Sequence, residues 1–197
     1  MKTLHYYFAL ISPFSYLGHE EFREIVDRDD VTVAFHPLQV GPLFAATGGV
    51  APSKRSPQRQ SMRLAELRRW SERKEIALNL QPAHFPVNEA LAARCIMTLT
   101  QDGVMPWDFI HQAHRVVWAE DGNLSDPAKV EEILTAAGHD ATAVMATAQT
   151  DAIGAAYDAC TEAAIETGVF GAPTFLIEDE LFWGQDRLDW VEAVLNA

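Results

Sequence analysis

Two serines that lie three residues apart follow an apolar run near the start of the chain. Ser12 and Ser15 belong to the stretch Ser12-Pro13-Phe14-Ser15, directly after the apolar segment 6–11. Serine is a favoured N-cap and proline is tolerated in the first helical turn, so the pattern predicts a strand that runs into a helix beginning at Pro13. A helix N-terminus presents unpaired N–H groups and a partial positive charge. The residues therefore predict a site that holds an anionic group, such as a thiolate, beside a serine hydroxyl.

The two cysteines do not belong to this junction. Thiol-disulfide enzymes of the thioredoxin kind carry Cys-X-X-Cys at such a strand-to-helix step, and here both outer positions are serine. Cys95 and Cys160 lie in alanine-rich segments that resemble helices. Free cysteine behaves as a small hydrophobe, so two buried free thiols are expected, and a disulfide between them stays open as the alternative. The serine pair favours an enzyme that holds the thiolate of another molecule.

A second motif, Gly168–Phe175, leads from a predicted helix into a predicted strand. Pro173 is compatible with the first position of a strand because it donates no ladder bond there. In thioredoxin-like folds a cis-proline loop faces the N-terminus of the first helix, and the backbone before the proline binds extended peptides. Together with Ser12, the motif predicts a cis Ala172–Pro173 bond and a substrate-binding backbone at Ala172.

A third motif, Trp183-Gly184-Gln185-Asp186, forms another strand-to-helix junction. In one interpretation, Asp186 is an N-cap and nothing more. In the other, the helix N-terminus holds a carboxylate while Asp186 pairs with an α-ammonium group. The γ-glutamyl end of glutathione carries both of these charges.

Basic residues concentrate in one segment of an otherwise acidic chain. The net charge is −13, yet eight of the 15 Lys and Arg residues lie between Lys54 and Lys74. They are Lys54, Arg55, Arg59, Arg63, Arg68, Arg69, Arg73 and Lys74. A solvated helix face accounts for most of them, but Lys54 and Arg55 lie in the preceding loop, where they could hold an anionic substrate.

The periodicity of apolar residues predicts a strand–helix–strand unit, a helical block and a strand–strand–helix unit. Strands are expected at 4–10 and 31–37 around a helix at 13–27, and 38–57 resembles a loop. Further helices are expected at 57–75, 88–101, 106–119, 126–134 and 151–167, followed by a hairpin at 174–183 and a helix at 186–195. A right-handed crossover makes the first two strands parallel. The order predicts an α/β protein with a thioredoxin-like fold (βαβ…ββα) and an all-helical insertion, the domains being 1–40 with 168–197, and 41–167.

Composition restricts the partners. The chain has 197 residues, of which 48% are hydrophobic and 22% charged, as in an ordinary globular protein. The charge of −13 argues against nucleic acid and anionic membranes, and no apolar run reaches the ~20 residues of a membrane span. A cytoplasmic location is the default. The seven histidines show no metal-binding spacing, so no metal is expected, and His111 and His114 are interpreted as structural or surface residues.

The three motifs also carry a resemblance. SPFSYLG, GVFGAPTF and FWGQDRLDWVE resemble the 2-hydroxychromene-2-carboxylate isomerases of the DsbA-like, kappa-class glutathione transferase group, and the resemblance spans nearly the whole chain. It implies glutathione as cofactor, a homodimer, and the interconversion of 2-hydroxychromene-2-carboxylate with trans-o-hydroxybenzylidenepyruvate in naphthalene breakdown. A kappa-type transferase or peroxidase acting on other electrophiles, and a non-catalytic glutathione-binding protein, remain as alternatives.

The resemblance also implies residue roles. Ser12 would hold the glutathione sulfur, and Ala172 with Pro173 would bind the cysteinyl backbone. The γ-glutamyl site would consist of Trp183, Gly184, Gln185 and Asp186. The aromatic carboxylate substrate would contact Phe14, Lys54, Arg55 and Phe85.

Overall fold

A four-stranded sheet forms the centre of the computed structural model, which describes residues 1–197. The strands are β1 (Lys2–Phe8), β2 (Val31–Pro37), β3 (Thr174–Ile177) and β4 (Glu180–Trp183), in the order β2-β1-β3-β4. β1 pairs with β2 in parallel, as predicted, and β3 is antiparallel to both β1 and β4. The sheet confirms the thioredoxin-like fold, with the helical block between its two halves.

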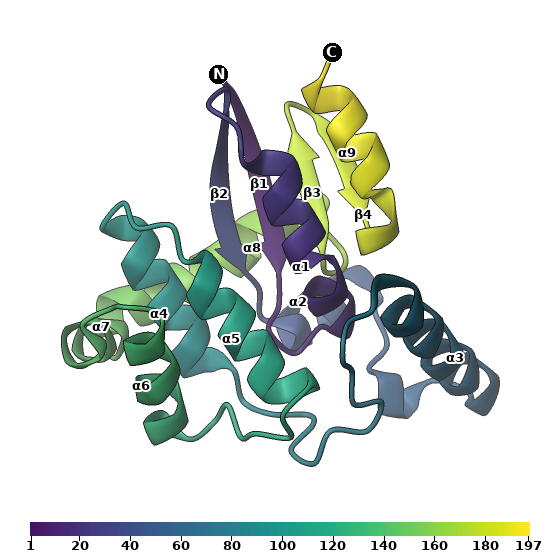
Figure 1. The fold of residues 1–197 in the computed structure, drawn as a ribbon, viewed down its shortest axis with the longest axis horizontal. Coiled ribbons are helices and arrows are strands. Elements are labelled where there is room, and N and C mark those ends of the chain that lie inside the picture. The colour runs from purple at the N-terminus through teal and green to yellow at the C-terminus, as the bar shows by residue number, and fades with distance from the viewer.

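Nine α-helices and two short 3-10 helices surround the sheet. They are α1 (Pro13–Val26), α2 (Val40–Thr47), η1 (Pro52–Lys54), α3 (Pro57–Lys74), α4 (Ala90–Gln101), α5 (Trp107–Trp118), α6 (Pro127–Ala136), α7 (Ala141–Ala148), α8 (Asp151–Glu166), η2 (Gln185–Arg187) and α9 (Leu188–Leu195). Figure 1 shows α1 and α9 in front of the sheet and α8 behind it, while α4 to α7 gather at one side. No helix is long and apolar enough to cross a membrane.

Alternate residues of β1 serve two cores, because successive side chains of a strand point to opposite faces. Tyr6 packs under α1, where its ring lies 5.4 Å from Phe175 of β3 and 4.6 Å from Phe22 of α1. Tyr7 points to the other face, into a smaller cluster that includes Leu43 of α2 and Ala164 of α8. The aromatic packing on Tyr6 fixes α1 against the sheet, and with it the position of Ser12.

Three of the predicted elements differ from the structure. The segment predicted as a loop contains α2, because Pro42 falls in a first helical turn and Gly48 ends the helix with a φ of +78°. The helix α7 was not predicted, although Asp140 caps it by accepting a hydrogen bond from the Ala143 N–H. The first strand ends at Phe8 rather than residue 10, because the chain then turns into the loop before α1.

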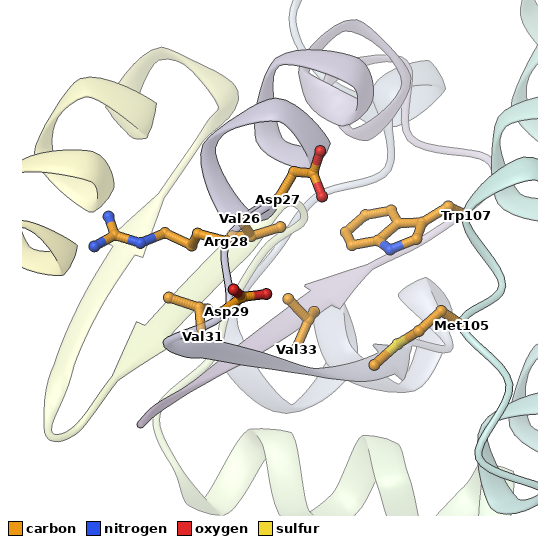
Figure 2. A pocket seen from close by; sticks show the side chains of 8 residues that line it. All are labelled: Val26, Asp27, Arg28, Asp29, Val31, Val33, Met105 and Trp107. Atoms are coloured by element: carbon orange, nitrogen blue, oxygen red, sulfur yellow. The ribbon is translucent and has the colours of Figure 1, made fainter.

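A cavity of about 350 Å³ lies far from Ser12, beside the edge strand β2. Val31 of this cavity pairs with Lys2 at the beginning of β1, whereas Ser12 follows the end of that strand. Figure 2 shows Trp107 and Met105 on one side of the hollow and Arg28 on the other. The cavity is therefore separate from the junction that the sequence indicates.

Candidate active site

Ser12 is the N-cap of α1. Its Oγ accepts a hydrogen bond from the Ser15 N–H at 3.2 Å and donates one to the carbonyl oxygen of Ala172 at 3.1 Å. Pro13 occupies the first helical position, as predicted. A single hydroxyl therefore joins the start of α1 to the loop before β3, and two motifs separated by 160 residues meet at one point.

The Ala172–Pro173 bond is cis, and the Ala172 carbonyl faces Ser12, as predicted. On the other side of the same loop, the Pro173 carbonyl accepts a hydrogen bond from the Gly184 N–H at 2.9 Å. Gly184 has a φ of +109°, and a Cβ built on it would lie 2.4 Å from Oδ1 of Asp186. Only glycine fits this position without strain. The turn after β4 is thus held against the cis-proline loop.

Two exposed aromatic rings flank this loop. Trp183 is 53% exposed and Phe170 is 46% exposed, and their ring centroids are 4.8 Å apart. A Cβ on Gly171 would lie 2.4 Å from Nε1 of Trp183, so the indole rests directly on the loop backbone. The pair forms an apolar wall beside Ala172.

Gln185 and Asp186 differ in their surroundings. Gln185 is buried against α1, where a Cβ on Gly18 would lie 2.7 Å from its own Cβ, and its Oε1 has no hydrogen-bond partner. Asp186 is exposed within η2 and accepts a hydrogen bond from Arg187 at 3.0 Å. Since the N-caps of η2 and α9 are Gly184 and Arg187, the interpretation of Asp186 as an N-cap is wrong.

The predicted basic residues lie at the start of the α3 region. Lys54 ends η1, and the Arg55 Nε donates to the Val50 carbonyl at 2.7 Å. Burial and the neighbouring Arg59 lower the pKa of Arg55, and burial and Arg55 lower that of Arg63. These three guanidinium groups have no carboxylate partner in the structure. No hydrogen bond or ion pair joins Lys54 or Arg55 to Ser12.

The two predicted aromatic contacts, Phe14 and Phe85, come from different elements. Phe14 is half-buried in the first turn of α1. Phe85 precedes α4, with its ring centroid 5.1 Å from that of Trp118. The Trp118 Nε1 in turn donates to the Leu10 carbonyl at 3.1 Å. Phe85 is therefore connected through Trp118 to the segment that leads into Ser12.

Three buried side chains of the helical block bind the backbone of Leu10 and Ile11, just before Ser12. The sequence alone did not identify them as site residues. Both His114 and Trp118 of α5 donate a hydrogen bond to the Leu10 carbonyl oxygen, from Nδ1 at 3.2 Å and from Nε1 at 3.1 Å respectively. Glu89, just before α4, accepts a hydrogen bond from the Ile11 N–H at 3.1 Å. The structural interpretation of His114 is confirmed. A lone acid at the beginning of an apolar helix was the only local signal for Glu89.

Glu89 is also the most perturbed acid near the junction. Burial raises the pKa of its carboxyl group to about 8, against the opposing effect of the N–H groups of Ile11 and Leu10. The carboxyl group is therefore mostly neutral at pH 7. Glu89 binds the N–H of Ile11, the residue directly before Ser12. A perturbed pKa so close to a candidate catalytic residue is typical of a functional site.

The cysteines contribute no thiolate to this site. Both are free, and burial raises the pKa of Cys95 to about 12 and that of Cys160 to about 11. A thiol with a raised pKa is a poor nucleophile at neutral pH. We therefore expect no insulin reduction by this protein; reduction that survives Cys95→Ser and Cys160→Ser would contradict the assignment of Ser12 and Ser15 as the equivalents of a redox pair.

The fold and the serine–cis-proline junction together define a thioredoxin-like protein without redox cysteines. The DSBA-like thioredoxin domain model matches residues 3–196. A 2-hydroxychromene-2-carboxylate isomerase of Sphingobium xenophagum is 29% identical over 98% of both chains. One of Pseudomonas putida is 30% identical over 97% of this chain and 93% of its own.

A solved structure agrees with these relatives. The structure of a 2-hydroxychromene-2-carboxylate isomerase superposes with a TM-score of 0.79 at 28% identity, covering 98% of this chain and 94% of the other. The chain belongs to the DSBA-like thioredoxin family, among the 2-hydroxychromene-2-carboxylate isomerases.

Proposed function

We propose that the protein interconverts 2-hydroxychromene-2-carboxylate and trans-o-hydroxybenzylidenepyruvate with glutathione as its cofactor. The printed names of the full-length relatives support the reaction. The hydrogen bond between the Ser12 hydroxyl and the Ala172 carbonyl supports the cofactor. An extended cysteinyl residue offers a sulfur that accepts and an N–H that donates, so it can replace both halves of this bond at once.

The junction suits a thiolate because its groups favour negative charge. The α1 N-terminus carries a partial positive charge, and the Ser12 hydroxyl can donate to a sulfur. An unperturbed thiol has a pKa near ~8.5, and such surroundings lower that value. Bound glutathione would supply a thiolate that adds to an electron-poor carbon of the chromene, after which the ring opens and the new single bond rotates. Elimination of glutathione would then re-form the double bond in the trans configuration and regenerate the thiol. The Trp183–Phe170 wall gives the site an apolar face.

The experiment that tests the proposal measures isomer interconversion spectrophotometrically with and without glutathione. We expect turnover only with the free thiol and none with S-methylglutathione, which keeps the charges but lacks a nucleophile. The thiol concentration should stay constant during turnover. Steady loss of thiol would instead support the transferase alternative, and turnover without any thiol would contradict the proposed cofactor.

Arg55 and Asp186 are expected to serve different ligands. Arg55, with Arg59 and Arg63, forms a strip of cations without carboxylate partners, which suits the substrate carboxylate. Arg55→Gln should raise the KM for the chromene about tenfold with little change in the KM for glutathione, because a charge-assisted hydrogen bond contributes about 1.5–3 kcal/mol. Asp186→Asn should raise mainly the KM for glutathione, whose ammonium group it would bind.

A matched control for Arg55 is Arg68→Gln, since Arg68 is exposed on α3, the helix that follows Arg55 in the chain. It removes one positive charge without touching the strip, so both KM values should stay within about twofold of wild type, as screened surface charges have small effects. Equal changes of both KM values in Arg55→Gln and Asp186→Asn would mean that the two residues are assigned to the wrong pockets.

A further inference from the structure

The interface between α1 and α5 contains four buried polar side-chain atoms to which no group outside this interface is hydrogen-bonded. They are Nδ1 of His19, Oε1 of Glu20, Nδ1 of His111 and Nε2 of His114. Only three other such atoms occur in the chain, in Ser15, Arg94 and Gln185. Oε1 of Glu20 and Nδ1 of His111 lie 2.8 Å apart and pair with each other when Nδ1 carries a proton, whereas Nδ1 of His19 and Nε2 of His114 have no partner. Buried polar atoms are nearly always paired, so this interface is a candidate binding site for a small ligand.

Three of these residues converge on one point. One ligand atom each from His19, Glu20 and His111 lies within 4.8 Å of the other two. Oε1 of Glu20 is 2.8 Å from Nδ1 of His111 and 3.9 Å from Nε2 of His19. Around a tetrahedral zinc ion with bonds of about 2.0–2.1 Å, neighbouring ligand atoms lie about 3.3 Å apart. The separations of 2.8 Å and 3.9 Å lie below and above the separation expected between zinc ligands.

We propose that His19, Glu20 and His111 bind one divalent cation of the zinc class. Two imidazoles and one carboxylate are a ligand set that zinc accepts, and imidazole favours zinc over magnesium or calcium. Three protein ligands leave a fourth position for water. The spacing in the sequence did not indicate this site, because the ligands come from two helices whose contact only the fold creates.

The protonation states suit metal binding. An imidazole binds a cation in its neutral form, and the full burial of the His19 side chain disfavours its charged form. One contact competes: Nε2 of His19 lies 3.2 Å from the Trp107 carbonyl, to which it donates in the metal-free protein. Binding through Nε2 replaces this hydrogen bond and moves the ring proton to Nδ1, where no group of the structure accepts it, so this state requires a buried water as acceptor.

The site is reachable from solvent. His19 is fully buried, but the side chains of Glu20 and His111 are 46% and 28% exposed, so a cation can enter from their side. His19 is seven residues beyond Ser12 on α1, or about 10 Å at 1.5 Å per residue. The cation would therefore tie α1 to α5 rather than touch the reacting atoms.

The test uses tag-free protein, first dialysed against a chelator. Calorimetric titration with Zn²⁺ should give one bound equivalent, and Co²⁺ should give the visible absorption bands of a tetrahedral nitrogen–oxygen site. Zn²⁺ should also raise the melting temperature of the wild-type protein. Absence of a saturable Zn²⁺ site would overturn the proposal and leave buried water as the partner of the orphaned atoms.

Four variants decide where the cation binds. His111→Ala and Glu20→Gln should each weaken Zn²⁺ binding by at least about 100-fold, since even the loss of an outer-sphere partner costs 10–100-fold. His84→Ala, an exposed histidine elsewhere, should bind like wild type. Cys160→Ser should too, although its Sγ lies 3.7 Å from Nδ1 of His36. Unchanged binding in His111→Ala, or its loss in Cys160→Ser, would contradict the assignment.

Discussion

Ser12→Ala is expected to lower the glutathione-dependent turnover about 10- to 100-fold. The change removes the hydroxyl that reaches the Ala172 carbonyl and that would donate to the thiolate. A hydrogen bond to a charged group contributes about 1.5–3 kcal/mol, and each 1.36 kcal/mol is tenfold in rate. The lost cap should reduce the free energy of unfolding by only about 1 kcal/mol. Initial rates at saturating glutathione and urea unfolding measure the two effects separately.

Ser15→Ala is the matched control. Ser15 is buried three residues further along α1, and its Oγ has no hydrogen-bond partner. Removing an unpaired buried hydroxyl costs nothing in hydrogen bonding, so turnover and stability should stay close to wild type. Its N–H still donates to Ser12. Wild-type turnover in Ser12→Ala, or equal losses in both variants, would be incompatible with the assigned role of Ser12.

The two sides of the Ser12–Ala172 junction were predictable because each motif carries a local signal of its own, and their meeting was predicted from the thioredoxin-like order of elements. A serine before a helix-opening proline and a proline at the start of a strand restrict the backbone whatever their surroundings. The alternation of apolar residues likewise predicted β2 at its observed bounds. Local chemistry therefore predicted the two sides of the junction, and the fold brought them together.

The support behind the junction was not predictable from local signals. Glu89, His114 and Trp118 reach the backbone of Leu10 and Ile11 across 78, 104 and 108 residues. A carboxylate or an imidazole at those positions looks the same in a sequence whether it is solvated or buried. Only the packing of α4 and α5 against the loop after β1 gives these side chains a function.

The consequence of that burial is a pH-dependent stability that Glu89 controls. Its pKa is raised from 4.5 to about 8 in the folded chain, so between these values the unfolded chain has released a proton that the folded chain keeps. Stability from this group is therefore fully present below about pH 4.5 and is lost as pH rises through 8. His19 and His114 have lowered pKa values and act in the opposite direction below pH 6.5. The window that isolates Glu89 is thus pH 6.5 to 8.

In that window the wild-type protein is expected to lose about 2 kcal/mol of unfolding free energy relative to Glu89→Gln, at about 1.4 kcal/mol per pH unit. Glutamine keeps an oxygen that can accept the Ile11 N–H, but it does not titrate. Urea unfolding of both proteins at several pH values gives the difference, in which the shared histidine contributions cancel. Parallel pH curves for the two proteins would mean that Glu89 is already ionised when folded. The carboxyl group would then be a buried anion, a state that burial disfavours and that the hydrogen bonds from the Ile11 and Leu10 N–H groups would have to stabilise.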